Sequence, residues 1–379
     1  MIVSFFVYGI LTAVLFVLGR KYQTTNKIIY LFILFAIYSL VMGARYGVGK
    51  DHLTYLNTYE NWEDISTSIW LRYEVGFVTF TNFFFKLNVP TLWYFTSFSF
   101  ILIFLYFFNF RRTPFLIPYM ALVFMISGVG ITGCTNGIRQ YVGAYMFMFI
   151  LPFMYEKKIL FYLLGVILAI SFHKTMIILI PIYFITYING KIVENNKFLA
   201  LCSIMIIGAV LLRLLIGNSM LLFFDDMLYF LQDMNYDQYL DTHLMEMSSS
   251  IGLFRLVKLL FNLTVLSTIP SLCKRYKVFL PFINMMCFLW IVGLILYYLF
   301  EGSLIMERLI LPFTIFNVPI YAIFLYYLSK KNSYGYYASL AILYFTFVMI
   351  IFNCKNNTAR YVTIFQESEY VQKQKEVYK

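Results

Sequence analysis

Hydrophobic residues occur along this chain in long continuous runs, separated by short polar segments. A helix needs about 20 mostly apolar residues to cross the hydrocarbon core of a bilayer. The runs that approach this length are predicted to form membrane-spanning helices. They lie at 2–18, 28–43, 91–109, 115–130, 137–154, 198–216, 251–270, 279–299, 309–328 and 334–352.

A further apolar stretch, residues 159–188, is interrupted only by His173 and Lys174. As one helix it would be about 45 Å long, which is far more than a bilayer needs. Two shorter helices that turn at His173–Lys174 fit better and bring the expected number of crossings to about 12. The segment 74–88 is too short to cross and is predicted to be an interfacial or re-entrant helix.

The composition agrees with this pattern, because hydrophobic residues make up 61% of the chain and charged residues only 12%. An average soluble domain carries roughly 25% charged residues. A soluble enzyme, a disordered protein and a secreted disulfide scaffold are therefore excluded. We predict an all-α, polytopic membrane protein, with one transmembrane domain over residues 1–352 and a polar C-terminal tail over 353–379.

Basic residues mark the short loops between the predicted helices. These loops contain Arg20, Lys21 and Lys27; Arg111 and Arg112; Lys157 and Lys158; Lys191 and Lys197; Lys274, Arg275 and Lys277; and Lys330 and Lys331. Loops that stay in the cytoplasm are enriched in Lys and Arg, so we expect all of them on that side. Both termini and the long segments 44–75 and 217–250 then face outward. The net charge of +11 reflects topology and does not predict a nucleic-acid partner.

The chain lacks the sequence signatures of several other protein classes. No P-loop, G-x-G-x-x-G or G-x-S-x-G motif occurs, which leaves an ATP-driven pump and a soluble-type hydrolase without support. The acidic residues at 217–250 do not match a calcium loop. The cysteines form no C-x-x-C pair and are interpreted as ordinary buried thiols, at Cys134, Cys202, Cys273, Cys287 and Cys354. We expect neither a metal nor a cofactor.

Charged residues near helix ends are the candidate functional residues, because a charge in hydrocarbon costs a few kcal/mol unless it is paired or hydrated. Arg45 follows the second apolar run, and a helix starting near Asp51 would place Asp51 and Tyr55 on one face. Arg139 lies in the first turn of a predicted helix, where an Arg is disfavoured unless an anion is close. The competing interpretations are that Arg45 only reaches lipid phosphate and that Asp51 only caps a helix.

Two further pairs of polar residues complete the set. His173 and Lys174 would need a hydrated cavity if they lie within the membrane, and an exposed turn is the alternative. Arg308, beside Glu307 at a helix start, could bind an anion or form a surface ion pair worth under about 1 kcal/mol. Arg255 and Lys258 are weaker candidates. Several Arg residues near one boundary suggest a phosphate-bearing lipid, because Arg binds phosphate oxygens bidentately.

The order and spacing of these residues resemble the EpsG family of Wzy-type bacterial polysaccharide polymerases. The resemblance is carried by Arg45…Gly49-x-Asp51…Tyr55, Ile138-Arg139-Gln140, Phe172-His173-Lys174 and Arg308. It implies a GT-C-like polymerase architecture in the inner membrane of a bacterium, with the active site facing the periplasm or exterior. It also implies a metal-independent glycosyltransferase that polymerises undecaprenyl-diphosphate-linked oligosaccharide repeats into O-antigen, capsule or exopolysaccharide.

The resemblance also implies partners and residue roles. The lipid-linked oligosaccharide would be both donor and acceptor within the bilayer, and a chain-length regulator and a flippase would be further partners. The expected roles are diphosphate binding by Arg45, Arg139 and Arg308, proton transfer from the acceptor hydroxyl by Asp51 or His173, and orientation of the sugar by Tyr55, Gln140 and Lys174.

Two other functions stay open at this point. An O-antigen ligase would use the same donor with a lipid A core acceptor, and a large external loop with paired basic residues would favour it. A flippase or transporter of lipid-linked oligosaccharide would bind the same lipid phosphate during passage. Its charges should follow the depth of a cavity, whereas here they cluster near one boundary.

Overall fold

The computed structural model describes residues 2–46, 51–63, 73–134, 136–188, 190–216, 253–301, 304–352 and 361. Over these residues the chain is helical and contains no strand, which confirms the all-α prediction. The segment 217–250, predicted to be external, and, apart from Tyr361, the tail 353–379 lie outside the described residues. The chain forms two compact units, one of Met1–Ile180 with Tyr321–Lys379 and one of Pro181–Ile320.

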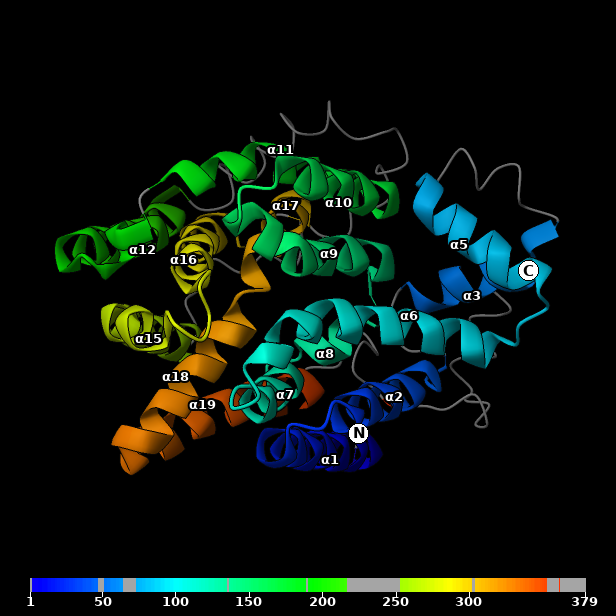
Figure 1. Ribbon diagram of the computed structural model, residues 1–379, viewed down its shortest axis with the longest axis horizontal. Helices are drawn as coiled ribbons and strands as arrows, with labels where there is room; N and C mark the ends of the chain where they lie inside the picture. The colour runs from blue at the N-terminus through cyan, green and yellow to red at the C-terminus, as the bar shows by residue number, and fades with distance from the viewer. Residues whose placement is uncertain are drawn as a thin grey trace. The chain divides into compact units, whose positions relative to one another are not determined.

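Every apolar run predicted from the sequence forms helix (Figure 1). The first unit contains α1 (Ile2–Thr25), α2 (Ile29–Gly43), α3 (His52–Glu60), α5 (Val75–Lys86), α6 (Thr91–Phe107), α7 (Ile117–Ile126), α8 (Val129–Thr132), α9 (Ile138–Tyr155), α10 (Ile159–Phe172), η2 (Lys174–Ile178) and α19 (Ser333–Phe352). The second unit contains η4 (Gly190–Glu194), α12 (Asn196–Ile216), α15 (Leu253–Tyr276), α16 (Ile283–Phe300) and α17 (Leu304–Thr314).

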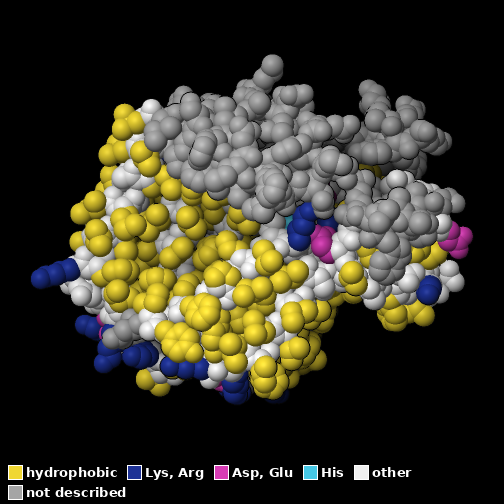
Figure 2. All heavy atoms as spheres, turned by 90° about the horizontal axis from the view of Figure 1, so that it is seen from above, with side chains coloured by type: hydrophobic (Ala, Val, Ile, Leu, Met, Phe, Trp, Pro, Cys, Tyr) yellow, Lys and Arg dark blue, Asp and Glu magenta, His cyan; other side chains and the backbone are white. Residues whose placement is uncertain are grey.

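Six of the described helices are long and apolar enough to cross a membrane. They cover Val3–Thr25, Thr91–Arg112, Asn196–Leu215, Arg255–Tyr276, Ile283–Phe300 and Met306–Lys331, the last of which counts two consecutive helices as one span. Hydrophobic side chains dominate the face shown in Figure 2, and charged side chains there are few. Along α10, Leu160, Leu164 and Ile167 are all more than 60% exposed on one face of the helix, which suits contact with lipid chains better than contact with water. The chain is a multi-pass membrane protein.

The interruption expected within residues 159–188 is confirmed. Helix α10 ends at Phe172, and His173 has an extended backbone with φ −157° and ψ 121° before η2 begins. Whether the two halves cross the membrane separately stays a prediction, as does the total of about 12 crossings. The short helix expected at 74–88 is present as α5.

The apolar run 309–328 is divided in a way that the run itself did not indicate. Helix α17 ends at Thr314 and α18 (Asn317–Lys331) begins after Ile315 and Phe316. The physical reason is Pro319, which has no N–H to donate to the carbonyl of Ile315 and is tolerated in a first helical turn. The backbone hydrogen-bond ladder is therefore interrupted before the proline.

Helices α9 and α10 form an antiparallel pair that determines where the polar residues of the first unit lie. A Cβ on Gly143, early in α9, would lie 3.1 Å from the carbonyl oxygen of Ala169, late in α10. Farther along the pair, a Cβ on Gly165 in the middle of α10 would lie 2.4 Å from Ile150 Cγ2. The start of α9 and the end of α10 are therefore adjacent. The basic loop of Lys157 and Lys158 lies at the opposite end, about 27 Å away for an 18-residue helix.

Basic loops group together within each unit. In the first unit, the Tyr22 hydroxyl near the end of α1 donates to the Arg111 carbonyl oxygen at 2.5 Å. In the second unit, Lys277 Nζ lies 3.9 Å from Glu194 Oε1, so the loops after η4 and α15 meet. This grouping is what the charge pattern predicts, because loops on one side of a membrane should share an end of the helices. The direction of the membrane stays a prediction.

Tyr361, in the C-terminal tail, forms hydrogen bonds with α1 and α2. The backbone N–H of Tyr361 donates to Ser4 Oγ at 2.8 Å, and its hydroxyl donates to the Val41 carbonyl oxygen at 3.2 Å. Its ring also lies edge-on to the Tyr8 ring, with 5.6 Å between centroids. Tyr361 thus lies against the N-terminal end of α1 and the C-terminal end of α2.

Candidate active site

The N-terminus of α9 is capped by a carboxylate from another part of the chain. Gly137 precedes the helix with φ +65°, a conformation that favours glycine, and its N–H donates to Asp51 Oδ2 at 2.7 Å. A carboxylate is stabilised there by the helix dipole. Helix α3 begins at His52, as predicted for a helix starting near Asp51, but the Asp51 side chain does not cap it. The aspartate caps α9 instead.

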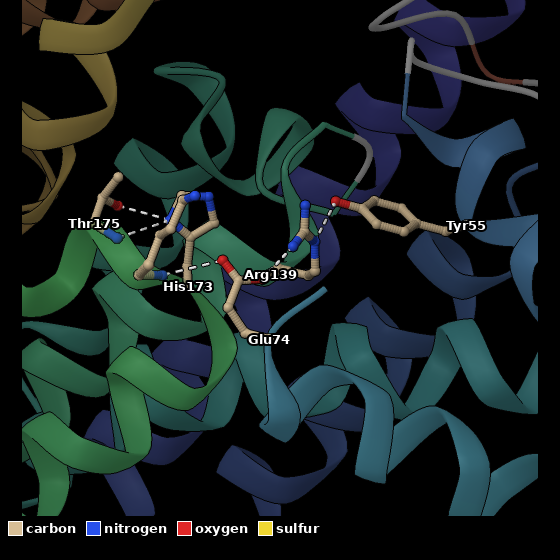
Figure 3. Close-up of polar contacts among 6 residues, drawn as sticks. Tyr55, Glu74, Arg139, His173 and Thr175 are labelled. Atoms are coloured by element: carbon tan, nitrogen blue, oxygen red, sulfur yellow. Dashed lines mark hydrogen bonds and ion pairs between the residues drawn. The ribbon is translucent and has the colours of Figure 1, made fainter. Parts of the chain in front are cut away.

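Arg139, in the first turn of α9, is held by an acidic and an aromatic partner (Figure 3). Its Nη1 forms an ion pair with Glu74 Oε2, and its Nε donates to the Tyr55 hydroxyl at 3.4 Å. The guanidinium carbon lies 4.4 Å from the centre of the Tyr73 ring. The side chains of Arg139 and Glu74 are only 18% and 16% exposed. The anion that the sequence required beside Arg139 is therefore Glu74.

Glu74 also connects Arg139 to the turn after α10. Its second carboxylate oxygen, Oε1, accepts a hydrogen bond from the backbone N–H of Lys174 at 3.1 Å. This contact is possible because α5 begins against the end of α10, where a Cβ on Gly76 would meet the Ser171 side chain at 2.4 Å. Glu74 is not among the residues predicted from the sequence, although an Arg in a first helical turn needs a nearby anion, and that need points to such a residue.

His173 is buried, at 9% exposure, and its ring is oriented by Thr175. Its Nδ1 lies 2.7 Å from Thr175 Oγ1 and accepts from the Thr175 backbone N–H at 3.4 Å. A backbone N–H can only donate, so Nδ1 acts as an acceptor and the proton of the neutral ring belongs on Nε2. Figure 3 shows His173 and Arg139 on either side of Glu74. His173 is therefore arranged to donate a hydrogen bond from Nε2.

Arg45 is a buried cation that neutral oxygens surround. It is 1% exposed, and its guanidinium donates to the Tyr8 hydroxyl at 3.1 Å and to the Ile131 carbonyl oxygen at 3.3 Å. Within the described part of the chain, no carboxylate forms an ion pair with it. A buried charge without a counter-ion is costly and is a common mark of a functional position. Its binding to diphosphate stays a prediction.

His52 is an uncharged neighbour of Arg45. It is 2% exposed and stacks on Phe95 with 4.3 Å between ring centroids. Burial, followed by the charge of Arg45, lowers the pKa of His52 from 6.5 to about 3. His52 therefore stays neutral in the folded protein under ordinary conditions.

Replacing His52 with phenylalanine is expected to remove part of the acid sensitivity of folding. The unfolded chain binds a proton at His52 as the pH falls below 6.5, whereas the folded protein does so only near pH 3. The stabilising contribution is complete above pH 6.5 and is lost as the pH falls toward 3. Between pH 8 and pH 5 the wild type should lose about 2 kcal/mol more stability than His52→Phe. Unfolding by SDS in mixed micelles measures this difference, and parallel losses would contradict it.

The remaining predicted residues are less closely joined. Gln140 is buried on α9, and Lys174 has an exposed side chain and donates its backbone N–H to Glu74. Arg308 lies on α17 in the second unit and is half-buried. Contacts in the first unit thus join Asp51 to the start of α9, Tyr55 to Arg139, and Glu74 to both Arg139 and the His173 turn. We call Asp51, Tyr55, Glu74, Arg139 and His173 the Arg139 cluster.

The Arg139 cluster combines donors for an anion with a group that can accept a proton. Arg139 uses Nη1 and Nε for the described contacts, which leaves Nη2 for phosphate oxygens. The hydrogen bond to Gly137 occupies one oxygen of Asp51 and leaves Oδ1 for a proton. Burial raises the pKa of Tyr55 to about 12, so its hydroxyl keeps a proton that it can donate. No group of three or more His, Cys, Asp or Glu among the described residues could hold a metal ion.

Comparison with known protein families gives a match over most of the chain. The EpsG family model matches residues 28–366, which include every residue of the Arg139 cluster and exclude all of α1. No curated protein and no solved structure matches the chain.

Proposed function

We propose that this chain, which belongs to the EpsG family of Wzy-type polysaccharide polymerase-like membrane proteins, polymerises undecaprenyl-diphosphate-linked oligosaccharide repeats. The product would be O-antigen, capsule or exopolysaccharide. The proposal includes about 12 membrane crossings in a GT-C-like arrangement, in a bacterial inner membrane. The Arg139 cluster would face the periplasm or exterior, because it lies at the end of α9 opposite the basic loop of Lys157 and Lys158.

The single observation that carries the proposal is the partly buried Arg139 at the start of α9, which is ion-paired with Glu74, while Glu74 also accepts from the backbone of the turn that contains His173. A helix N-terminus and a guanidinium both favour phosphate oxygens. When the sugar C1–O bond to the diphosphate breaks, negative charge develops on the departing oxygen. Arg139 and Nε2–H of His173 would stabilise that charge, and donors of this kind contribute most when they are fixed before the reaction.

Asp51 is our choice as the base over His173. The acceptor hydroxyl must lose its proton as its oxygen forms the new bond to C1, and Oδ1 of Asp51 is available to take it. The orientation of His173 places its proton on Nε2, which makes it a donor at this stage. The lipid diphosphate leaves with the electron pair of the broken C1–O bond, and Asp51 later gives its proton to water. Tyr55, Gln140 and Lys174 are proposed to orient the sugar, and Arg45 and Arg308 to assist with diphosphate.

Purified chain in proteoliposomes tests this function directly. The substrate is the lipid-linked repeat extracted from source cells that lack this chain, where it should accumulate. We expect a ladder of longer lipid-linked oligosaccharides together with released lipid diphosphate. Transfer only to added lipid A core would identify a ligase, and movement of unmodified lipid across the bilayer without a ladder would identify a flippase. Either result would replace the polymerase assignment.

A further inference from the structure

A second group of charged residues lies in the second unit, at the ends of α12, α15 and α16. Arg255 Nη2 forms an ion pair with Glu301 Oε2, and Arg213 Nε donates to the Glu301 carbonyl oxygen at 3.4 Å. Lys258 Nζ donates to the Tyr297 hydroxyl at 3.2 Å, and that hydroxyl donates to Glu301 Oε1 at 2.8 Å. We call these five residues the Glu301 cluster. It lies at the opposite ends of α12 and α15 from Lys197 and Lys274.

Positive charge exceeds negative charge within this cluster. Three cations gather around the one carboxylate of Glu301, and Arg213 is close enough to Arg255 for their charges to repel. Glu307 on α17 acts on Tyr297 from nearby, but its side chain is exposed and therefore screened. Arg255 Nε is buried and donates to no acceptor among the described residues. Among the described residues, the Lys258 ammonium contacts the hydroxyl and ring of Tyr297 but forms no ion pair with a carboxylate, and Arg255 Nε is a hydrogen-bond donor without an acceptor.

The cluster is also built on a fixed frame. One turn along α15 from Lys258, the buried Asn262 side chain donates to the Tyr298 hydroxyl of α16 at 2.9 Å. Asn262 is fully buried. This bond joins α15 and α16 beside the cluster, so Arg255, Lys258 and Tyr297 keep their spacing without help from Glu301. A preformed set of donors is what tight anion binding requires.

We propose that the Glu301 cluster is a binding site for a lipid phosphate or diphosphate, and that Glu301 occupies it in the absence of that ligand. The carboxylate carries one negative charge, whereas a phosphate group offers more charge and three acceptor oxygens to the same cations. Arg255 presents a planar fork, and Lys258 and Arg213 approach from neighbouring helices. The incoming phosphate displaces the Glu301 side chain and also accepts from Arg255 Nε.

The surroundings favour an anion that carries a hydrocarbon chain. On the last turns of α12, next to Arg213, Leu211 is 53% and Leu215 is 84% exposed. On α15, Leu256 and Leu260 flank Lys258 and are 44% and 55% exposed. Exposed apolar side chains beside a cationic site are the arrangement expected where a lipid chain lies along the helices and its headgroup meets the cations. The site does not depend on the proposed glycosyltransferase reaction.

Binding of a short prenyl diphosphate to the full chain in nanodiscs tests this site. Arg255→Ala and Lys258→Ala should each weaken binding about 10-fold, the usual effect of losing one charge-assisted hydrogen bond. Glu301→Gln should strengthen binding, because it removes the competing charge while keeping the shape. Glu194→Gln removes the same charge from the opposite end of the second unit and should change nothing. Glu301→Gln should raise the affinity for the prenyl diphosphate and Arg255→Ala should lower it. Loss of a merely structural ion pair would change the affinity in the same direction in both variants.

Several outcomes decide the matter. Weaker or unchanged binding in Glu301→Gln, or unchanged binding in Arg255→Ala, overturns the site.

Photo-crosslinking of a diazirine-bearing prenyl diphosphate to the wild type needs no variant. Labelled peptides from 208–216 and 255–262 support the site, and label confined to other peptides contradicts it. Equal competition by inorganic pyrophosphate would show that the phosphate alone is bound, and competition only by phosphatidylglycerol nanodiscs would identify a bilayer phospholipid. Each readout is independent of polymer formation, so the two proposals can fail separately.

Discussion

Arg139→Ala is expected to lower the rate of lipid diphosphate release by about 100- to 1000-fold, the usual effect of losing one fixed donor to a developing oxyanion. Arg139 is a partly buried cation with a donor nitrogen, Nη2, left over after its contacts to Glu74 and Tyr55. The measurement is the initial rate of lipid diphosphate release in proteoliposomes, with polymer length followed on the same samples. Arg139→Lys keeps the charge but loses the planar fork, so it should recover only part of the rate.

The control for Arg139→Ala must separate catalysis from folding. The alanine leaves Glu74 charged and largely buried, and breaking such a pair can cost about 3–5 kcal/mol of stability. The double variant Arg139→Met with Glu74→Gln removes both charges and should fold well. It should be as inactive as the single variant. Recovery of polymer formation in the double variant would show that Arg139 acts only by neutralising Glu74.

Asp51→Asn is expected to reduce kcat by about 100- to 10,000-fold, the contribution of a general base. An asparagine carbonyl oxygen can still accept from the Gly137 N–H, so the cap of α9 is preserved while the proton acceptor is lost. KM should therefore change little. Glu60→Gln alters an exposed carboxylate on the same helix and should have wild-type activity. Full activity in Asp51→Asn with loss in His173→Gln would transfer the role of base to His173.

The helices could be predicted from the sequence because the requirement for each is local. A run of about 20 apolar residues satisfies both the hydrogen bonding of its own backbone and the hydrocarbon around it. The break at His173 followed from the same length argument. The division before α18 did not, because mainly apolar residues continue on both sides of it and the interruption depends on Pro319, whose missing N–H leaves the Ile315 carbonyl without a donor.

For the candidate site, the sequence could predict which residues require a partner but not which residues supply it. The position of Arg139 in a first turn required an anion, and Glu74 supplies it from 65 residues away in the sequence. That partnership depends on how α5 packs against the end of α10, which no local pattern contains. The Asp51 carboxylate likewise crosses 86 residues to reach Gly137. The sequence indicates the residue types and the helix ends, whereas the contacts between residues far apart in the chain depend on tertiary packing.

The first helix has a consequence for comparing this chain with other members of its family. Tyr8 of α1 accepts a hydrogen bond from Arg45, yet the family match begins only at residue 28. A homologue without an equivalent of α1 would leave that guanidinium one acceptor short and open to its surroundings. Homologues can therefore differ in how they hold this arginine even when they share every residue within the family match.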